Sequence, residues 1–176
     1  MAAIAVAAAG VFVYLQRTEP AWWARLWYPL SYASIIRGHA ANYRLDPALL
    51  AAVIEEESKF DASARSSAGA VGLMQLTPQT AKGIAEYTGG SKFVLSDLYD
   101  PEINVRYGAW YLRHLLDRYH DERTALAAYN AGQENVDRWR ARHEGVQFPE
   151  TRAYVDRVER LKAIYAKAYG AELGLG

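Results

Sequence analysis

The chain has 176 residues, of which 51% are hydrophobic and 23% charged, so it has enough apolar sequence for one globular core and too little length for two full domains. Twenty basic and twenty acidic side chains cancel, which excludes a strong overall field for attracting nucleic acid. There is no cysteine, so disulfides, thiolate nucleophiles and cysteine-bound metal centres are also excluded.

The chain begins with an uncharged apolar run from Ala2 to Leu15. This run is short for a membrane-spanning helix and nearer in length to the core of a signal peptide. An aromatic cluster suited to a membrane interface follows it: Trp22, Trp23, Trp27 and Tyr28. We therefore interpret residues 1–27 as a signal or membrane-anchor segment with an aromatic juxtamembrane stretch. This predicts an extracytoplasmic protein, anchored to the cell membrane or secreted to the cell wall. A helix packed on the domain is the alternative.

Residues 28–170 are expected to form one almost wholly helical domain, with a short tail at 171–176, because helix start and stop signals recur and strand-like alternation is scarce. The expected helices are 34–43, 47–58, 78–87, 101–120, 123–129, 134–142 and 151–168. Asp46, Thr77 and Asp100 each precede a proline, the pattern of an N-cap followed by a first-turn proline. Residues 61–72 are rich in Ser, Ala and Gly, which predicts an ordered loop.

Glu57 is the least expected residue on the helix 47–58. At about 100° per residue it falls within about 20° of Leu50 on the apolar face, whereas Glu55 and Glu56 lie roughly 140° and 120° away from Leu50. A carboxyl group in an apolar setting either finds partners or raises its pKa, and a protonated carboxyl can act as a general acid. Fraying of the helix end, or pairing with a buried arginine, are structural alternatives that the helix alone leaves open.

Three short strings occur in order along the chain: Glu57-Ser58, then Gly72-Leu73-Met74-Gln75, then Ala128-Tyr129-Asn130-Ala131-Gly132. Each is weak alone, because glycines also make turns, Met74 could fill a core and Tyr129 could be a core aromatic. Further elements of the same ordered set are Ala51-Ala52-Val53-Ile54, Ser66, Gly69-Ala70, Pro78, Thr80-Ala81, Glu150-Thr151 and Tyr154-Val155. With this set, the chain from about Leu45 to Val155 resembles the soluble lytic transglycosylase-like family, of the glycoside hydrolase family 23 type.

The resemblance implies an all-α fold, a goose-type lysozyme-like helical domain with a substrate groove, here preceded by an N-terminal apolar helix. It implies that Glu57 is the sole catalytic acid and base. It also implies a set of substrate-binding residues: Ser66, Gly72, Met74, Gln75, Tyr129, Asn130 and Glu150. The family cleaves the β-1,4 bond between N-acetylmuramic acid and N-acetylglucosamine of peptidoglycan and leaves 1,6-anhydromuramic ends without consuming water. The implied partner is the glycan strand, bound by a monomer, with no metal and no organic cofactor.

The residue chemistry agrees with a mechanism that uses one carboxyl. With a pKa raised toward about 6, the carboxyl of Glu57 can protonate the leaving oxygen and then accept the proton of the attacking 6-hydroxyl. An ordinary retaining glycosidase needs a second carboxylate about 5 Å away, and Glu56, Asp61 and Glu150 show no clear nucleophile pattern. The N-acetyl group of the substrate is the expected helper. A hydrolytic muramidase of the same fold, and a non-catalytic glycan-binding or scaffold module, are the alternatives.

The polar neighbours have expected roles as well. Tyr129 is expected to donate its hydroxyl to Glu57 or to the scissile oxygen, and the Gln75 amide matches an acetamido group, with helix capping as its alternative. Glu150 either binds substrate or opens the last helix. The four histidines show no metal-ligand spacing: His39, His114, His120 and His143.

Overall fold

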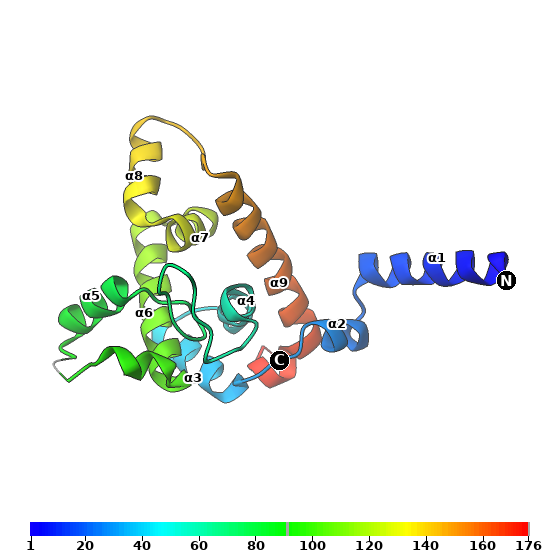
Figure 1. The fold of residues 1–176 in the computed structure, drawn as a ribbon, viewed down its shortest axis with the longest axis horizontal. Coiled ribbons are helices and arrows are strands. Elements are labelled where there is room, and N and C mark those ends of the chain that lie inside the picture. Colours follow the sequence, from blue (N-terminus) through cyan, green and yellow to red (C-terminus); the bar gives the residue numbers. More distant parts are fainter. Residues whose placement is uncertain (91, 176) are drawn as a thin grey trace.

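The computed structural model describes residues 1–90 and 92–175, except for the side chains of residues 2, 3, 5, 8 and 16. Every regular element in this part of the chain is a helix (Figure 1). In chain order they are α1 (Ala2–Thr18), α2 (Ala21–Trp27), α3 (Ala33–Tyr43), α4 (Pro47–Ser58), α5 (Pro78–Thr88), the 3-10 helix η1 (Leu95–Tyr99), α6 (Pro101–Tyr119), α7 (Glu122–Ala131), α8 (Gln133–Ala141) and α9 (Pro149–Leu173). The expected all-α class is confirmed.

The predicted helix starts are confirmed by their capping contacts. The side chains of Asp46, Thr77 and Asp100 each accept a hydrogen bond from a backbone N–H in the following first turn, at 2.8, 3.1 and 3.1 Å. Each cap satisfies a donor that the helix itself leaves unpaired, and the proline that follows has no N–H to satisfy. The starts of α4, α5 and α6 are therefore fixed by local chemistry before any tertiary packing.

Helix α4 lies at the centre of the fold. All residues from Ala48 to Ile54 are at most 1% exposed, on every side of the helix. It packs against α9 and α3, and Figure 1 shows it end-on between α6 and α9. A helix enclosed on all sides also holds its last turn, where Glu57 lies, against neighbouring elements.

The apolar side chains form two clusters. The larger one joins α3, α4, α6, α7 and α9, and contains Ile36, Leu50, Leu112, Leu126 and Tyr165 among others. The smaller one is formed where α5, η1 and the loop before α5 pack on α6, with Ile84, Leu98 and Tyr107 as members. Helix α5 therefore belongs to a separate layer, at the left of Figure 1.

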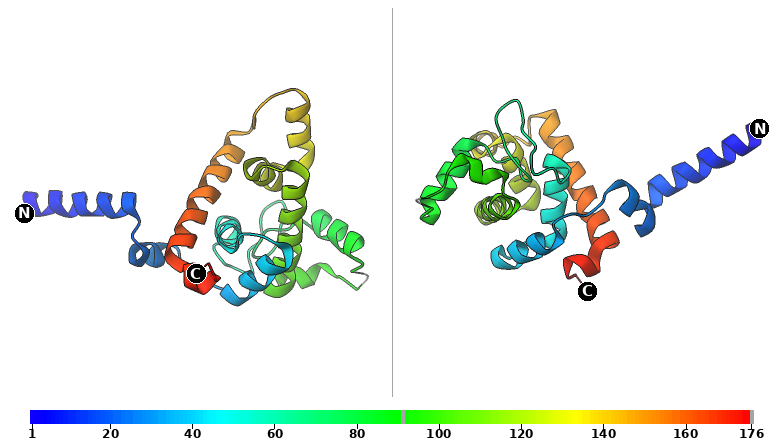
Figure 2. Two further views of the ribbon diagram at one scale, coloured as in Figure 1. Left: turned by 180° about the vertical axis from the view of Figure 1, so that it is seen from behind. Right: turned by 60° about the horizontal axis from the view of Figure 1, so that its bottom comes forward.

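Helix α1 lies outside the main core, whereas α2 joins the larger cluster through the buried Ala24. Figure 2 shows α1 projecting away from the other helices in both views. Helix α2 packs on α9, where Arg25 donates to the carbonyl of Ala168 at 3.0 Å, pairs with Glu172 at 2.7 Å and lies 4.6 Å from the ring centre of Tyr169. None of the helices in the described part of the chain has the length and apolarity needed to cross a membrane. The membrane anchor expected in residues 1–27 gains no support from them.

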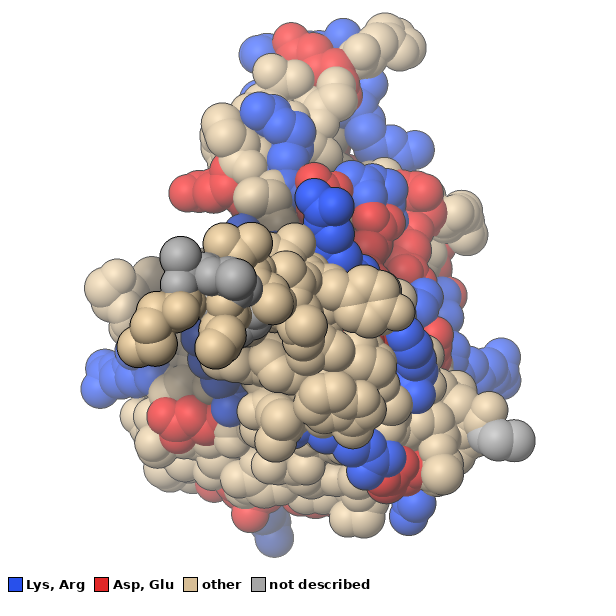
Figure 3. All heavy atoms as spheres, turned by 90° about the vertical axis from the view of Figure 1, so that its right-hand side faces the viewer, with Lys and Arg blue, Asp and Glu red and all other residues tan. Residues whose placement is uncertain are grey.

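Charge on the α9 side of the molecule is mixed in sign. Figure 3, which views this side, shows basic and acidic side chains interspersed over α9 around a largely uncharged centre. Many are paired, as Arg157 is with Glu56 at 2.7 Å and Lys162 with Glu122 at 2.8 Å. This agrees with the absence of a strong overall field that the balanced composition predicts.

Candidate active site

Glu57 occupies the last turn of α4 and retains contact with solvent through a partly exposed side chain. The helix does not fray before it, because Lys59 caps the end in the left-handed conformation with its N–H bonded to the carbonyl of Glu55. Burial raises the pKa of Glu57 from 4.5 to about 7, and the negative charge of Glu56 adds to the rise. Near neutral pH, a substantial fraction of Glu57 is therefore protonated and can donate a proton.

Tyr154 is the direct partner of Glu57. Its hydroxyl, on α9, donates a hydrogen bond of 2.7 Å to Oε1 of Glu57, and its side chain is only 3% exposed. This bond lowers the pKa of Glu57 and so opposes the larger effect of burial. It also fixes the orientation of the carboxyl group. Tyr154 was part of the motif set but was not among the predicted site residues, because its contact with Glu57 joins residues 97 positions apart.

The two neighbouring carboxyl groups do not point freely into solvent as their helical angles suggested. Glu56 Oε1 accepts hydrogen bonds from Arg157 at 2.7 and 2.8 Å, and its side chain is only 17% exposed. Burial raises the pKa of Glu55, while the Tyr165 hydroxyl on α9 lowers it. The reason is that α9 covers this side of α4, so an angle measured from Leu50 does not separate core from solvent. Among the contacts of the described residues, Glu56 is the one of the three carboxyl groups that forms an ion pair, while the charge of Lys59 acts on Glu55 without a direct contact.

The loop between α4 and α5 is tied to the end of α4. Ser58 Oγ donates to the carbonyl of Leu73 at 2.8 Å, and Val71 forms isolated bridges with Arg65 and with Leu76. Gly72 has a positive φ of 78°, and a Cβ there would lie 2.2 Å from Nδ2 of Asn104. Glycine is thus required at this position by both conformation and space. The predicted ordered loop is confirmed, and Gly72 acts through its backbone.

Asn104 on α6 anchors this loop and was not predicted. It is fully buried, accepts from Met74 N at 2.8 Å and donates to the carbonyls of Val71 and Leu98 at 2.9 and 2.8 Å. A buried amide with all these bonds satisfied is a rigid fixture. The sequence signal was only a polar residue at a buried helical position.

The side chain of Tyr129 contacts the main chain of Met74. The Tyr129 hydroxyl donates to the carbonyl of Met74 at 2.8 Å, so its proton is not directed at Glu57 as expected. Burial raises the pKa of Tyr129 well above its ordinary value, and the nearby charge of Glu57 adds to the shift. The Met74 side chain is fully buried and packs closely on Gly108, where an added Cβ would lie within 3 Å of it. Met74 therefore has the core-filling role that was considered for it. These residues therefore frame the site without a bond to the acid.

Gln75 and Ser66 both bond to the backbone of the loop. Gln75 has a positive φ of 47°, and its Nε2 donates to the carbonyls of Gly72 and Ala64 at 2.9 and 3.1 Å. Ser66 Oγ accepts from Ala70 N at 3.0 Å. Gln75 does not cap a helix. Contact of either side chain with a sugar stays a prediction.

Asn130 lies at the end of α7, and Glu150 lies at the start of α9. Oδ1 of Asn130 accepts from the buried hydroxyl of Thr151 at 2.8 Å, which joins these two helices. Glu150 is exposed in the first turn of α9, where a negative charge favours the helix dipole. This position of Glu150 is compatible with either role considered for it, substrate binding or opening of the last helix.

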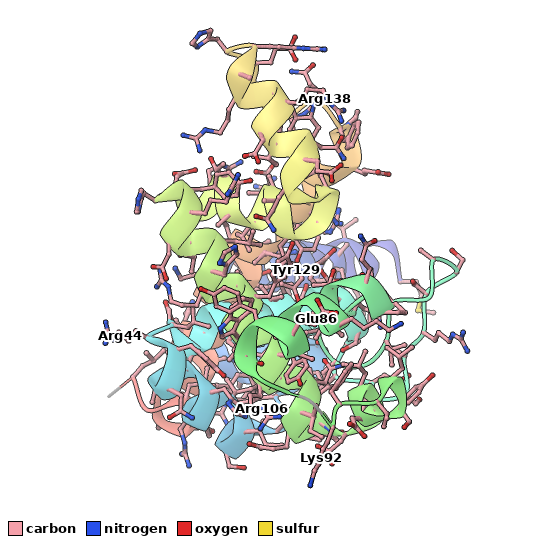
Figure 4. All side chains as sticks on the ribbon, turned by 90° about the vertical axis from the view of Figure 1, so that its left-hand side faces the viewer. Arg44, Glu86, Lys92, Arg106, Tyr129 and Arg138 are labelled. Carbon is pink, nitrogen blue, oxygen red and sulfur yellow. The ribbon has the colours of Figure 1, made fainter. Side chains whose placement is uncertain are left out.

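A hollow of about 530 Å³ lies next to this cluster, between α5, α6 and the start of α8. Tyr111 belongs to its lining, and the ring of Tyr111 is 5.4 Å from that of Tyr129. In Figure 4, Tyr129 lies between α5 and α8, two of the helices that line the hollow. The hollow therefore adjoins the candidate site through Tyr111, although none of the predicted site residues belongs to its lining.

No group of three or more His, Asp or Glu side chains in the described residues is arranged to hold a metal ion. Of the histidines, His39 is buried and pairs with Glu102 at 2.8 Å, and His114 stacks on Trp110. His39 therefore has a structural contact, and His114 lies on the wall of the hollow.

Comparison with known proteins gives a consistent family assignment. Residues 34–150 match the family described as transglycosylase SLT domain. A transglycosylase of Enterobacteria phage PRD1 is 41% identical over 113 residues, which are 64% of this chain and 39% of the phage protein. The soluble lytic murein transglycosylase of Salmonella typhimurium is 29% identical over 84% of this chain and 25% of its own length. The chain therefore spans well under half of the curated relatives it matches.

Solved structures agree. An inactive mutant of the lytic transglycosylase Slt from Pseudomonas aeruginosa has a TM-score of 0.75 at 32% identity, covering 84% of this chain and 26% of that one. The 70 kDa soluble lytic transglycosylase of Escherichia coli has a TM-score of 0.76 at 28% identity, covering 82% and 25%. A complex of the 70 kDa soluble lytic transglycosylase with bulgecin A has a TM-score of 0.76 at 28% identity, covering 81% of this chain and 25% of that one.

Proposed function

We propose that this chain, which belongs to the transglycosylase SLT domain family, is a lytic transglycosylase of peptidoglycan. Its reaction would cleave the β-1,4 bond between N-acetylmuramic acid and N-acetylglucosamine and form a 1,6-anhydromuramic end. The observation that carries the proposal is the state of Glu57, a partly exposed carboxyl with a pKa of about 7 that is held by Tyr154.

The proposed chemistry uses Glu57 twice. The protonated carboxyl donates its proton to the glycosidic oxygen as the bond from that oxygen to C1 of the muramic residue breaks. The carboxylate then accepts the proton of the muramyl 6-hydroxyl as O6 forms a new bond to C1. The net change moves one proton from O6 to the leaving oxygen and consumes no water. A pKa near neutrality suits both steps, because each form of the carboxyl is accessible.

The surroundings of the other carboxyl groups support a mechanism with one acid. Glu56 is engaged by Arg157, and Asp61 is turned to the N–H and hydroxyl of Ser63 at 2.8 and 2.7 Å. Glu150 lies at the exposed start of α9. A retaining glycosidase needs a second carboxylate that lies about 5 Å from the first and is free to act as nucleophile. The contacts of these three carboxylates do not meet this requirement. The N-acetyl group of the substrate is the proposed source of the second stabilising contact.

The remaining parts of the proposal concern binding and location. The substrate groove would pass Glu57 and Tyr129 and use the loop from Ser66 to Gln75, which the bonds of Asn104 and Ser58 support. The catalytic unit would be residues 28–170, acting as a monomer without metal or organic cofactor. We place the protein outside the cytoplasm, where its substrate lies.

Contact with a membrane surface is also proposed for α1 and α2. Large apolar side chains on both helices are exposed, including Ile4, Phe12, Trp22 and Trp27. Trp22, Trp23 and Phe12 pack edge to face at 5.7 Å, which gives the junction of the two helices an aromatic surface. Such side chains favour the interface between water and lipid.

The test of the activity is digestion of purified peptidoglycan with analysis of product mass. Muramic ends lighter by one water than hydrolytic ends are expected, and reducing muramic ends would instead identify a hydrolytic muramidase. Glu57→Gln keeps the shape of the side chain but removes the acid, so turnover should fall about a thousandfold while glycan binding remains. If the wild-type protein binds glycan yet turns over no peptidoglycan, it is a binding module and the proposed activity is wrong.

A further inference from the structure

The wall of the hollow beside Tyr129 is aromatic, and neither the predicted site nor the proposed chemistry uses it. Trp110 and Tyr87 face each other across α6 and α5 with ring centres 5.2 Å apart. The ring of His114, one turn along α6, stacks on Trp110 at 5.3 Å and only 6° from parallel. Tyr87 is 78% exposed, which leaves its ring open for contact. Exposed aromatic groups of this kind usually mark a contact surface.

The size of the hollow matches a binding site. Its volume of about 530 Å³ lies within the range of about 300–1,000 Å³ typical of sites for small organic ligands. Side-chain amides accompany the aromatic rings, because Gln79 and Gln133 belong to the lining. An amide can both donate and accept hydrogen bonds. Flat apolar rings together with amides suit a ligand that has apolar faces and a polar rim, as a pyranose ring with hydroxyl and acetamido groups has.

The charged residues around the hollow indicate which ligand charge the hollow favours. None of the described residues that line it is Lys or Arg, and Glu134 is its one carboxylate. Arg138, on the next turn of α8, donates to Asn135 of the lining at 3.1 Å but does not itself line the hollow. A carboxylate-bearing ligand would meet Glu134 without a cation in the lining to offset the repulsion. The hollow therefore favours an uncharged ligand over the anionic stem peptides of peptidoglycan.

We propose that this hollow binds uncharged N-acetylhexosamine units of the glycan strand away from the scissile bond, with Trp110 and Tyr87 as the stacking wall. Continuity with the candidate site comes from Tyr111, which lines the hollow and lies against Tyr129. The identity of the ligand as glycan rests on the proposed function. The consequence is a preference for peptide-free stretches of glycan, gained through Trp110 and Tyr87.

Calorimetric titration with chitohexaose, a peptide-free N-acetylglucosamine hexamer, tests the site without any need for turnover. In a Glu57→Gln background, Trp110→Ala should weaken binding about tenfold, the size expected for losing one aromatic contact. Trp110→Phe should restore most of the affinity, since a flat ring remains. The control is Trp27→Ala, which removes a tryptophan that is 54% exposed on α2, away from the hollow, and should leave binding unchanged. Equal affinities for Trp110→Ala and the control would overturn the proposal.

Two further measurements test the proposed glycan site. If Trp110→Ala does not fold, Tyr87→Ala removes a ring that the fold leaves 78% exposed, and it should weaken binding of chitohexaose severalfold. A glycan hexamer that carries stem peptides should bind no more tightly than chitohexaose, and tighter binding would overturn the preference for uncharged sugars. Binding that depends on Trp110 in a protein without turnover would refute the proposed activity and leave this site standing.

Discussion

At the scale of single residues, the site depends on the different surroundings of three consecutive carboxyl groups. Glu56 is paired with Arg157, Glu55 lies near the Tyr165 hydroxyl, and Glu57 has the Tyr154 hydroxyl and no ion pair with any of the described residues. A neutral hydrogen-bond donor stabilises the negative charge of a carboxylate less than an arginine does, and so it lowers the pKa of the carboxyl group less. The pKa of Glu57 can therefore stay near neutrality while its orientation is held.

Replacing Tyr154 with Phe should move the alkaline limb of the activity profile upward. The hydroxyl of Tyr154 lowers the pKa of Glu57, so its removal lets burial raise that pKa further above about 7. Because the protonated form is the proton donor, activity should persist to higher pH even though its maximum falls. The measurement is kcat/KM across the neutral range. Tyr129→Phe, which removes a hydroxyl bonded to Met74, should lower the rate without this shift. A shift of the limb to lower pH would contradict the prediction.

Ionisation of the Glu57 carboxyl should also lower the stability of the folded protein at alkaline pH. Its pKa is raised on folding from 4.5 to about 7, so its stabilising contribution is present below 4.5 and is lost as the pH rises through 7. Glu57→Gln has no charge to bury, and it should be more stable than the wild type at pH values above 7, by up to about 3 kcal/mol. Urea unfolding of both proteins at several pH values checks this. A stability difference that stays constant with pH would refute it.

The sequence predicted the inward placement of Glu57 at the end of α4, but it did not reveal the residues that contact Glu57 and the loop beside it. The inward position of Glu57 followed from the helical angle and from the motif strings. The same angles turned Glu55 and Glu56 away from Leu50, but they did not reveal that α9 covers that side, where Arg157 and the Tyr165 hydroxyl meet these two carboxyl groups. Tyr154 and Asn104 act through contacts between distant parts of the chain. Local sequence patterns carry no information on such pairings.

At the scale of elements, the loop between α4 and α5 is positioned mainly from α6. Asn104 holds the loop at Val71 and Met74 and also binds η1 through Leu98. The two bridges of Val71 give the loop a hairpin-like form without a regular strand. The part of the site that follows Gly72 is thereby as rigid as the helix behind it.

Gly72→Ala should destabilise the protein strongly. A Cβ at residue 72 would lie 2.2 Å from Nδ2 of Asn104 and 2.5 Å from the carbonyl oxygen of Leu98, in a left-handed conformation. The expected loss in the free energy of unfolding is about 3 kcal/mol or more. Gly69→Ala is a matched control, because φ is 82° there and nothing lies within 4 Å, so only backbone strain of about 1 kcal/mol applies. Equal losses for the two variants, measured by urea unfolding, would show that Asn104 does not constrain the loop.

The element pattern was the most predictable level of the structure. Capping residues and first-turn prolines identified α4, α5 and α6 almost to the residue. The 3-10 helix η1 was missed, because it is only five residues long and its capping contact comes from Asp97 within it. Helix α9 extends to Leu173, beyond the expected 168, where Tyr169 departs from helical geometry. The smaller core around α5 depends on side chains from three elements, which no local pattern reveals.

At the scale of the whole molecule, α9 connects the N-terminal helices to the site. Its end contacts α2 through Arg25, Tyr169 and Glu172, and its beginning carries Tyr154 to Glu57. Arg160 on the same helix pairs with Glu19 just after α1. The position of α1 and α2 is therefore set by the helix that also completes the site.

Binding to lipid vesicles should depend on the exposed side chains of α1. Phe12→Glu places a charge at a position that is 48% exposed and adjoins Trp23, and it should reduce cosedimentation with phosphatidylcholine vesicles severalfold. Tyr99→Glu makes the same kind of change on η1, at an exposed position, and should have no effect. If neither the wild type nor Tyr99→Glu binds vesicles, the proposed membrane contact is wrong.

The enclosure of α4 by α9 has a consequence for the order in which the protein acquires its chemistry. Residues of α4 leave the ribosome before those of α9, so the emerging chain holds Glu57 without Tyr154 and without the cover of the last helix. In that state the carboxyl is hydrated, with the acidity of an ordinary glutamate, and at neutral pH it has no proton to give. The proposed catalytic group therefore lacks its proton-donating state during synthesis of the preceding helices and gains it only when α9 docks on α4.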